Sequence, residues 1–407
     1  MMTTNSNIPP GYKDSAVGII PQEWKVKQLA LLGKMFSGGT PSTDKEEYWG
    51  GNIMWCTPSD ITSISSKYIN NTKDRITAMG LKNSSAILLP INSIIVCTRA
   101  TIGAAAITQV ELSTNQGFKN IKPEKCNTEW LYYSMILNQP KLQRLGCGST
   151  FLEVSKRDFE RLKLAVPPIG EQRKIAEILG VWDEAIERQS RLIEKLELRK
   201  RALMQRLLTG RTRLPGFTTP WQKVKLGEIF KERNEMKCEH LPLLSITAER
   251  GVILQSESDK KDTSNDDKSK YKRICPNDIG YNTMRMWQGR SALSAMEGIV
   301  SPAYTIVTPK VGIDPLFISE LIKQPRVVYD FWTHSQGLVG DTLNCKFHDF
   351  SQVKVAIPSL PEQKAIAEVL TTADKEIATH RKKLDALRFQ KRGLMQQLLT
   401  GKTRVKM

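Results

Sequence analysis

A long internal repeat is the feature that most constrains how this chain can fold. The stretch "EQRKIAEIL" begins at Glu171, and "EQKAIAEVL" begins at Glu362, 191 positions later. Extended outward, residues 159–213 and 350–404 align without a gap, and 24 of the 55 aligned positions are identical. Chance does not produce an ungapped match of this length, so we interpret the segment as a duplicated structural element.

The repeated segment has the periodicity of a coiled-coil helix. Ten positions in alternating steps of four and three, within 175–207 and again within 366–398, are apolar in eight of ten cases in each copy. The polar exceptions fall at matching places: Gln189 and Lys200, and His380 and Lys391. They could set the register of a helix pair or lie at its rim. Two such helices can bury each other's apolar seams, so the sequence predicts an intramolecular antiparallel coiled coil; a spacer helix or a zipper between chains is the alternative.

Each predicted helix follows a globular stretch, and the two stretches share a weak skeleton. "WKVKQL" at Trp24 resembles "WQKVKL" at Trp221, and an Arg-x-x-x-Gly motif aligns Arg99 with Arg285. Short β-branched runs, turns and one late helix predict α+β domains. We therefore expect two α+β globular domains and two long helices with a pseudo-twofold internal repeat. The expected segments are a first domain over 1–158, a helical region over 159–213, a second domain over 214–349 and a helical region over 350–407.

The charge balance favours a polyanionic partner. The chain has 60 Lys and Arg against 42 Asp and Glu, a net charge of +18, and nucleic acid fits this better than an anionic membrane surface. No run of about 18 apolar residues predicts a membrane span, and no secretory signal is recognised. None of the seven cysteines forms a Cys-x-x-Cys pair. We therefore expect a reduced, cytoplasmic protein without a metal site.

Motifs that would indicate catalysis are incomplete. The stretch "SPAY" at 301–304 has Ala303 where an amino-group methyltransferase motif has a second proline. The stretch "TGKTR" at Thr400 lacks the earlier glycine of a phosphate-binding loop, since Gln396 stands there. Neither Gly-x-Ser-x-Gly nor His-Glu-x-x-His occurs. The sequence therefore disfavours a self-contained methyltransferase or nuclease.

The repeated stretches resemble a known family. "PPIGEQRKIAEIL" with "LMQRLLTGRTR", and "PSLPEQKAIAEVL" with "LMQQLLTGKTR", resemble the conserved regions of the specificity subunit of type I restriction–modification systems. Stretches within 37–61 and 281–304 are similar to target recognition domains of the same family. The resemblance implies a non-catalytic, DNA-binding subunit with two target recognition domains. Each domain would read one half of an asymmetric bipartite target, and the helices would serve as ruler and docking platform.

The resemblance also implies partners and the location of cofactors. Two modification subunits would bind S-adenosylmethionine and methylate adenine in DNA, and restriction subunits with ATP- and Mg-dependent translocase and nuclease activity would join them in defence against foreign DNA. No cofactor would be bound by this chain. A stand-alone architectural or regulatory DNA-binding protein, which uses the coiled coil for its own assembly, remains the alternative.

Candidate DNA contacts are polar side chains in matched turns. Arg99 and Arg285 are the first choices, because arginine suits guanine or phosphate. The loop Ser37, Gly38, Gly39 and Thr40 could bring backbone amides to a phosphate. Further candidates are Thr98, Thr101, Asn115 and Gln116 in the first domain, and Arg250, Asn282, Gln288 and Tyr304 in the second. Alternatively, Arg-x-x-x-Gly closes a hairpin with a salt bridge, and Gly38-Gly39 is a plain turn.

Overall fold

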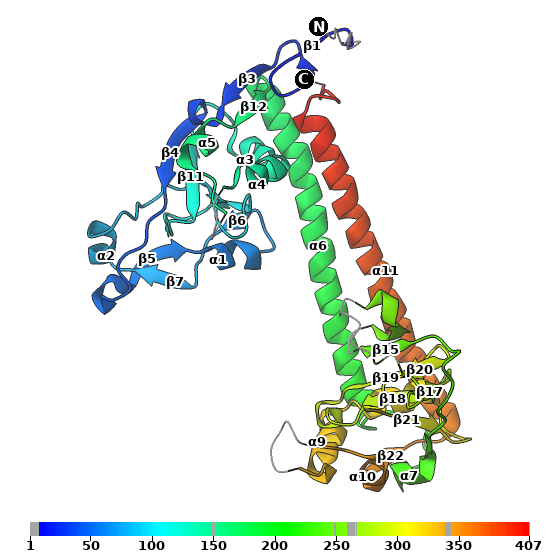
Figure 1. The fold of residues 1–407 in the computed structure, drawn as a ribbon. Helices are drawn as coiled ribbons and strands as arrows, with labels where there is room; N and C mark the ends of the chain where they lie inside the picture. The colour runs from blue at the N-terminus through cyan, green and yellow to red at the C-terminus, as the bar shows by residue number, and fades with distance from the viewer. Residues whose placement is uncertain are drawn as a thin grey trace. The chain divides into compact units, whose positions relative to one another are not determined.

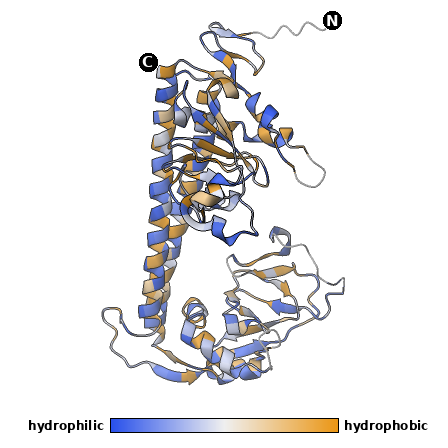
Figure 2. Cartoon of the chain, turned by 90° about the vertical axis from the view of Figure 1, so that its left-hand side faces the viewer, coloured by the Kyte–Doolittle hydropathy of each residue, from blue (hydrophilic) through white to orange (hydrophobic). Residues whose placement is uncertain are grey.

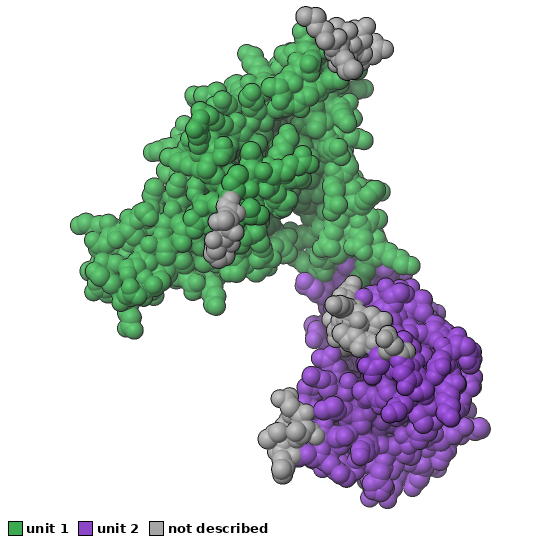
Figure 3. Space-filling view, viewed as in Figure 1, with its two compact units in different colours: residues 1–192, 381–407 green, residues 193–380 purple. Residues whose placement is uncertain are grey.

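The computed structural model describes residues 8–147, 152–247, 250–258, 265, 267–337 and 343–406. These form two compact units (Figure 3): unit 1 contains 1–192 and 381–407, and unit 2 contains 193–380. The boundary crosses both long helices, so each unit holds one globular part and a segment of each helix. The expected four-segment division of the chain does not follow from this partition and stays a prediction.

Two long helices confirm the helical interpretation of the repeat. They are α6 (Ile169–Leu207) and α11 (Leu360–Leu399), which run side by side (Figure 1). Hydrophobic and hydrophilic residues alternate along them (Figure 2). None of the twenty predicted seam positions is exposed. The seam therefore packs as an apolar strip between the two helices, as its period requires.

The two seam lysines show that the helices are antiparallel. In unit 2, Lys200 lies 2.7 Å from the carboxylate of Asp374. In unit 1, Lys391 pairs with Asp183. A higher residue number on α6 thus faces a lower one on α11, as the sequence predicts. The two lysines occupy matching positions of the repeat. The same Lys–Asp ion pair therefore forms twice and helps to define the register of the helix pair.

The Glu-Gln pair that opens each repeat is buried and joins the helix to its globular part. Gln172 accepts a hydrogen bond from the backbone N–H of Asn127 at 2.8 Å and donates to the carbonyl of Pro167 at 2.8 Å. Gln363 does the same with the N–H of Asp314 at 2.8 Å and the carbonyl of Pro358 at 2.9 Å. The repeated Glu-Gln sequence therefore makes the same pair of hydrogen bonds between helix and globular part in both units.

The glutamates of these pairs bind arginines from the ends of the repeats. In unit 1, Arg404 donates to Glu171 at 2.7 Å. In unit 2, Arg213 donates to both oxygens of Glu362, at 2.6 and 2.7 Å. Each glutamate is only 1% exposed. Each arginine lies at the end of one copy of the repeat and binds the glutamate at the start of the long helix in the other copy. The two copies therefore form two equivalent ion pairs with each other.

A mixed or antiparallel sheet forms the centre of each globular part. In unit 1 the strand order is β4 (Gly33–Ser37), β11 (Phe118–Pro123), β8 (Ile94–Cys97), β9 (Ala105–Thr108), β6 (Tyr68–Ile69). In unit 2 it is β14 (Phe230–Arg233), β21 (Tyr304–Pro309), β18 (Ile279–Asn282), β19 (Ser291–Leu293). The first four strands of the larger sheet correspond in order to the four strands of the smaller one, which confirms the shared skeleton.

Matching elements join each sheet to its long helix. A two-stranded ribbon precedes the helix in both units: β3 (Lys25–Gln28) with β12 (Lys163–Val166), and β13 (Gln222–Lys225) with β22 (Lys354–Ile357). The paired helices are α3 (Thr128–Leu137) and α8 (Pro315–Leu321), α4 (Gln139–Leu145) and α9 (Pro325–His334), and α5 (Lys156–Glu160) and α10 (Phe347–Gln352). These correspondences extend the pseudo-twofold repeat from the helices to the globular parts.

One further pair of elements corresponds: the 3-10 turn η1 (Leu29–Leu31) and the short helix α7 (Leu226–Ile229) each follow the matching ribbon strand. The remaining elements differ between the units. Unit 1 adds β1 (Tyr12–Lys13), β2 (Ile20–Pro21), β5 (Trp49–Cys56), α1 (Pro58–Ser63), β7 (Asp74–Ile76), α2 (Ala78–Lys82), β10 (Ser113–Thr114) and the 3-10 turn η2 (Glu46–Tyr48). Unit 2 adds β15 (Leu244–Thr247), β16 (Gly251–Leu254), β17 (Lys272–Ile274), β20 (Gly298–Val300) and the 3-10 turns η3 (Gln255–Glu257) and η4 (Met286–Gln288). The two globular parts thus share a frame and differ around it.

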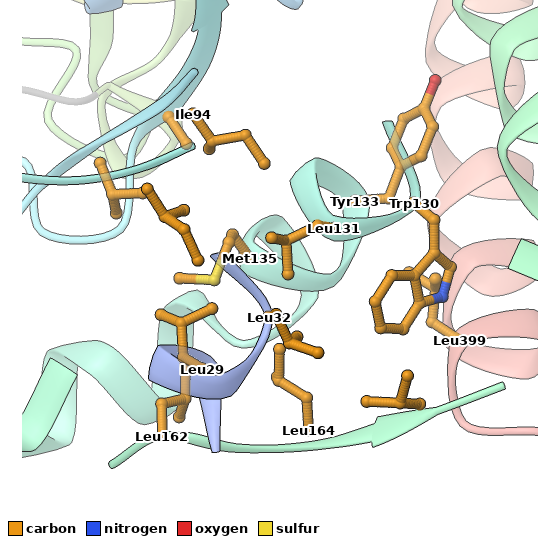
Figure 4. Close-up of a cluster of buried hydrophobic side chains, with 14 of the residues drawn as sticks. Leu29, Leu32, Ile94, Trp130, Leu131, Tyr133, Met135, Leu162, Leu164 and Leu399 are labelled. Atoms are coloured by element: carbon orange, nitrogen blue, oxygen red, sulfur yellow. The ribbon is translucent and has the colours of Figure 1, made fainter. Parts of the chain in front are cut away.

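One continuous core holds the first globular part to the helix pair. Figure 4 shows Leu131 and Met135 of α3 beside Leu29 and Leu32, with Leu399 of α11 near Trp130. The indole of Trp130 is fully buried. Because helix and sheet residues share this core, removing either face would expose apolar surface on the other.

Candidate nucleic-acid interface

The sheet registers show that Arg99 and Arg285 lie in corresponding loops. Before the loop, Cys97 pairs with Phe118 across the first sheet, and Asn282 pairs with Tyr304 across the second. After the loop, Ala105 pairs with Val96, and Ser291 pairs with Tyr281. The unit 2 loop is one residue longer, so Arg99 matches Met284 when counted from the first strand and Arg285 when counted back from the second. The alignment of Arg99 with Arg285 therefore stays a prediction.

A polar pocket in unit 2 brings together three of the predicted residues. It has a volume of about 350 Å³ and lies at the ends of β15, β18, β19 and β21. Its lining comprises Ile246, Thr247, Asn282, Arg285, Arg290, Ser291 and Tyr304. Asn282, Arg285 and Tyr304 were expected from the sequence, and the other four were not. Among the described residues, this lining contains no carboxylate, and the polar groups that they present to the pocket are cationic or neutral.

Local hydrogen bonds define the loop that carries the two arginines. The side chain of Asn282 accepts the backbone N–H of Met284 at 3.0 Å. The N–H of Asn282 donates to the carbonyl of Arg290 at 3.0 Å, which closes the loop at its base. Gly289 has a φ of 71°, a left-handed conformation that a residue with a Cβ adopts at a cost. The loop is therefore tied at both ends by its own backbone.

Tyr304 supplies a neutral hydroxyl to the pocket. Its hydroxyl donates to the carbonyl of Ile246 at 3.4 Å. Burial raises the pKa of Tyr304, and a hydrogen bond with Asn282 opposes this only partly. The phenol therefore stays protonated at neutral pH and keeps both a donor and an acceptor.

The other two predicted residues of unit 2 lie outside this lining. Arg250 is exposed and donates to the carbonyl of Glu257 at 2.9 Å. Gln288 is exposed at the end of η4. Trp287, between the arginines, donates its indole N–H to the carbonyl of Met284 at 2.9 Å and so supports the loop.

In unit 1 the candidate Arg99 is neutralised by a carboxylate. Its guanidinium lies 2.6 Å from Glu153, which also pairs with Lys119 at 3.3 Å. Arg99 and Glu153 form a β-bridge as well. The alternative that this motif closes the chain with a salt bridge therefore describes Arg99, whereas the guanidinium of Arg285 has no side-chain partner among the described residues.

The Arg99–Glu153 pair predicts a specific pH dependence. Burial alone would raise the pKa of Glu153, but hydrogen bonds and charges from Arg99 and Lys119 outweigh it and lower the pKa. The pair therefore stabilises the fold fully above the ordinary range near 4.5, and the stabilisation is lost as pH falls through the lowered pKa. Wild type should be more stable than Glu153→Gln at pH 7, and the difference in free energy of unfolding should shrink below about pH 4.5. A constant difference between pH 7 and pH 3 would contradict this.

The two glycine amides of the loop from Ser37 to Thr40 are already bonded within the chain. The N–H groups of Gly38 and Gly39 donate to the carbonyls of Phe118, at 3.2 Å, and Thr114, at 2.8 Å. A Cβ on Gly38 would lie 1.8 Å from the carbonyl oxygen of Asn115. The glycines therefore allow two backbone segments to approach closely, and a contact of this loop with phosphate stays a prediction.

The remaining candidates of unit 1 fall into buried and exposed groups. Thr98 is fully buried and donates to the carbonyl of Gly117 at 3.1 Å, so it has no surface for DNA in this structure. Asn115 is half-buried, and its side chain accepts the N–H of Gly117 at 2.9 Å. Thr101 and Gln116 are exposed. Among these residues, the exposed pair keeps the most surface for an external contact, Asn115 keeps some, and Thr98 keeps none.

The described residues show neither a metal-binding cluster nor a membrane-spanning helix. Within these ranges, no three His, Cys, Asp or Glu side chains are grouped so that they could hold a metal ion. Across the same residues, every helix is too short or too polar to cross a membrane.

Comparison with known sequences identifies similar proteins. A family described as "Type I restriction modification DNA specificity domain" matches residues 21–198 and 319–388, more than half of the chain. The MjaIX specificity subunit of a type I restriction enzyme from Methanocaldococcus jannaschii is 36% identical over 193 residues, which are 46% of this chain and 45% of that protein. The EcoR124I/EcoR124II specificity subunit from Escherichia coli is 29% identical over 180 residues, 42% of this chain and 44% of that protein. The chain thus spans less than half the length of these two relatives.

A longer match and two solved structures extend the likeness over the chain. The MjaVIII specificity subunit from Methanocaldococcus jannaschii is 25% identical over 420 residues, 95% of this chain and 94% of that protein. The S subunit from M. genitalium has a TM-score of 0.55 at 14% identity and covers 100% of this chain and 99% of its own. A chain from a study of assembly and conformational transition of a type I system has a TM-score of 0.60 at 16% identity, covering 94% and 99%. At these identities, the two structures show a shared fold.

Proposed function

Because this chain belongs to the family of type I restriction–modification DNA specificity domains, we propose that it selects the DNA target of such a complex. Each globular part reads one half of a bipartite double-stranded sequence. The chain is a non-catalytic subunit, binds no cofactor itself and directs methylation by its partners.

The observation that carries this proposal is that the two globular parts share the same strands and helices but have different polar residues at corresponding positions. At corresponding strand positions, the unit 2 pocket has Asn282, Ser291 and Tyr304, and unit 1 has Cys97, Ala105 and Phe118. Conversely, the ion pair of Lys119 with Glu153 in unit 1 corresponds to Thr305 and Asn344 in unit 2. Base edges are distinguished by where donors and acceptors stand. Two domains whose polar groups stand at different positions of the same fold would therefore read two different half-sites.

The helix pair supports the proposed docking role. Of the large apolar side chains on the long helices that stay exposed, the three with the largest exposed fractions are Val181 at 63%, Leu198 at 61% and Phe389 at 76%. They are candidate contact points for another protein. We assign this surface to two modification subunits, which carry S-adenosylmethionine. Restriction subunits, which use ATP and Mg, join the same complex.

The alternative, a stand-alone architectural or regulatory protein, is not favoured, because the similar curated proteins are specificity subunits. The two functions predict different behaviour. A specificity subunit produces methylation only with its partner, whereas a stand-alone regulator binds a discrete sequence alone and forms homo-oligomers through the coiled coil.

The experiment that tests the function is co-expression with the modification subunit from the same host, followed by single-molecule sequencing for methyladenine. We expect one asymmetric, bipartite methylated motif that disappears when this chain is omitted. If no such motif appears and this chain alone binds a specific DNA sequence, the regulatory alternative replaces the proposal.

A further inference from the structure

The arginine pocket of unit 2 is the strongest unassigned feature of the molecule. Arg285 and Arg290 both line it, and both are exposed. Among the described residues, no carboxylate or other side chain pairs with either guanidinium. In contrast, Arg233, Arg273 and Arg404 each bind one or more carboxylates. Two unpaired guanidiniums in one pocket are therefore left for a partner outside the chain.

The pocket presents hydrogen-bonding groups at a defined place. Its loop is closed by the backbone bond between Asn282 and Arg290, and Arg290 also donates its N–H to the carbonyl of Arg285 at 3.4 Å. The hydroxyl of Ser291, in the pocket wall, is buried and has no hydrogen-bond partner in the described structure. A buried hydroxyl without a partner costs free energy, which a ligand group can recover.

The character of these groups selects the ligand. Guanidinium donors with fixed geometry match a pair of neighbouring acceptors, and guanine presents such a pair, O6 and N7, in the major groove. Adenine and cytosine each present an amino donor there, which guanidinium cannot accept. The side chains of Ile246 and Tyr304 line the same pocket as the two arginines.

We propose that this pocket reads guanine in the half-site of unit 2, with Arg285 and Arg290 as the specificity-determining residues. This deepens the proposed function and rests on it. In the corresponding loop of unit 1, Arg99 is paired with Glu153 at 2.6 Å, so it does not offer the same free guanidinium. The half-site read by unit 2 therefore contains at least one G·C pair whose recognition depends on this pocket.

The test uses the full chain with its modification subunit. After the wild-type motif is mapped, Arg285→Ala, Arg290→Ala and Arg285→Lys are compared on synthetic duplexes that carry each base at each position. Arg285→Lys keeps the charge but loses the fork geometry. A second set of duplexes carries 7-deazaguanine, which lacks the N7 acceptor. Arg326→Ala, at an exposed position of helix α9 in the same unit, makes the same charge change outside this pocket and is the matched control.

We expect at least one of the alanine variants to reduce discrimination at one G·C position of one half-site by about 10- to 100-fold. Where Arg285→Ala relaxes that position, Arg285→Lys should relax it too, and Arg326→Ala should leave the motif unchanged. The same position should be sensitive to 7-deazaguanine in wild type and insensitive in the relaxed variant.

Two results would overturn the inference while leaving the function intact. One is a wild-type motif that every arginine variant keeps. The other is uniform weakening across all sequences with a salt slope reduced by about 1 per arginine, which indicates phosphate contacts. If wild type methylates no bipartite motif, the proposed function fails and this inference falls with it.

Discussion

Lengthening both long helices by one turn should lengthen the unread spacer between the two halves of the DNA target and leave both halves unchanged. Four residues add roughly 6 Å to a helix, and base pairs are spaced at about 3.4 Å. We therefore expect one or two additional base pairs between the half-sites. The reason is that the proposed reading groups belong to the globular parts, whereas the helices connect them.

The antiparallel register determines where the insertions belong. Lys200 faces Asp374, so four residues after Arg199 must be matched by four after Asp374. This leaves the pairs of Lys200 with Asp374 and of Arg199 with Glu376 on their own sides of the insertion. An insertion of four is a stutter, which a coiled coil absorbs by local unwinding.

The control is the same insertion in α6 alone. It displaces one seam against the other, so the complex should lose methylation instead of gaining a longer spacer. Methylation mapping distinguishes the results. Altered half-sites in the double insertion, or an unchanged spacer, would show that the helix pair does not set the spacing.

Replacing Trp24 by alanine should destabilise unit 1 by about 3–5 kcal/mol, the usual cost of truncating a buried aromatic side chain. Trp24 is fully buried and its indole N–H donates to Glu171 at 2.9 Å. Trp24→Phe keeps most of the apolar contact and removes this bond, so it should cost about 1–3 kcal/mol. Urea unfolding measures the loss, and limited proteolysis identifies the unit that opens.

The repeat supplies a matched control for this experiment. Trp221 corresponds to Trp24, but it is only half-buried and its indole nitrogen has no hydrogen-bond partner in the described structure. Trp221→Ala should therefore cost less than Trp24→Ala and should act on unit 2. Equal losses from the two variants would show that the buried bond to Glu171 contributes nothing.

The helical part of the fold was predictable because its signal is local. The spacing of apolar residues identified every seam position, and none of them is exposed. Lys200 and Lys391 were recognised as exceptions in the seam, but their aspartate partners were not. Those partners lie 174 and 208 positions away, beyond the reach of a periodic pattern.

The candidate site was less predictable because its contacts are not local. Three residues of the unit 2 pocket were named in advance, since they lie in one short stretch or in a matching motif. Arg290 and Ser291 were missed, although they lie at the end of that stretch. Their place in the pocket comes from the pairing of β18 with β19, which the motif does not show.

By itself, the sequence determined the duplication, the two long helices, the excess of basic residues and the likeness to a specificity subunit. Only the tertiary structure decided which arginine is available. Arg99 and Arg285 stand in similar motifs, but Glu153, 54 positions from Arg99, neutralises the first, and no described side chain neutralises the second. The physical reason is that helix formation and seam burial depend on spacing along the chain, whereas an ion pair depends on which distant residue the fold brings within a few ångströms.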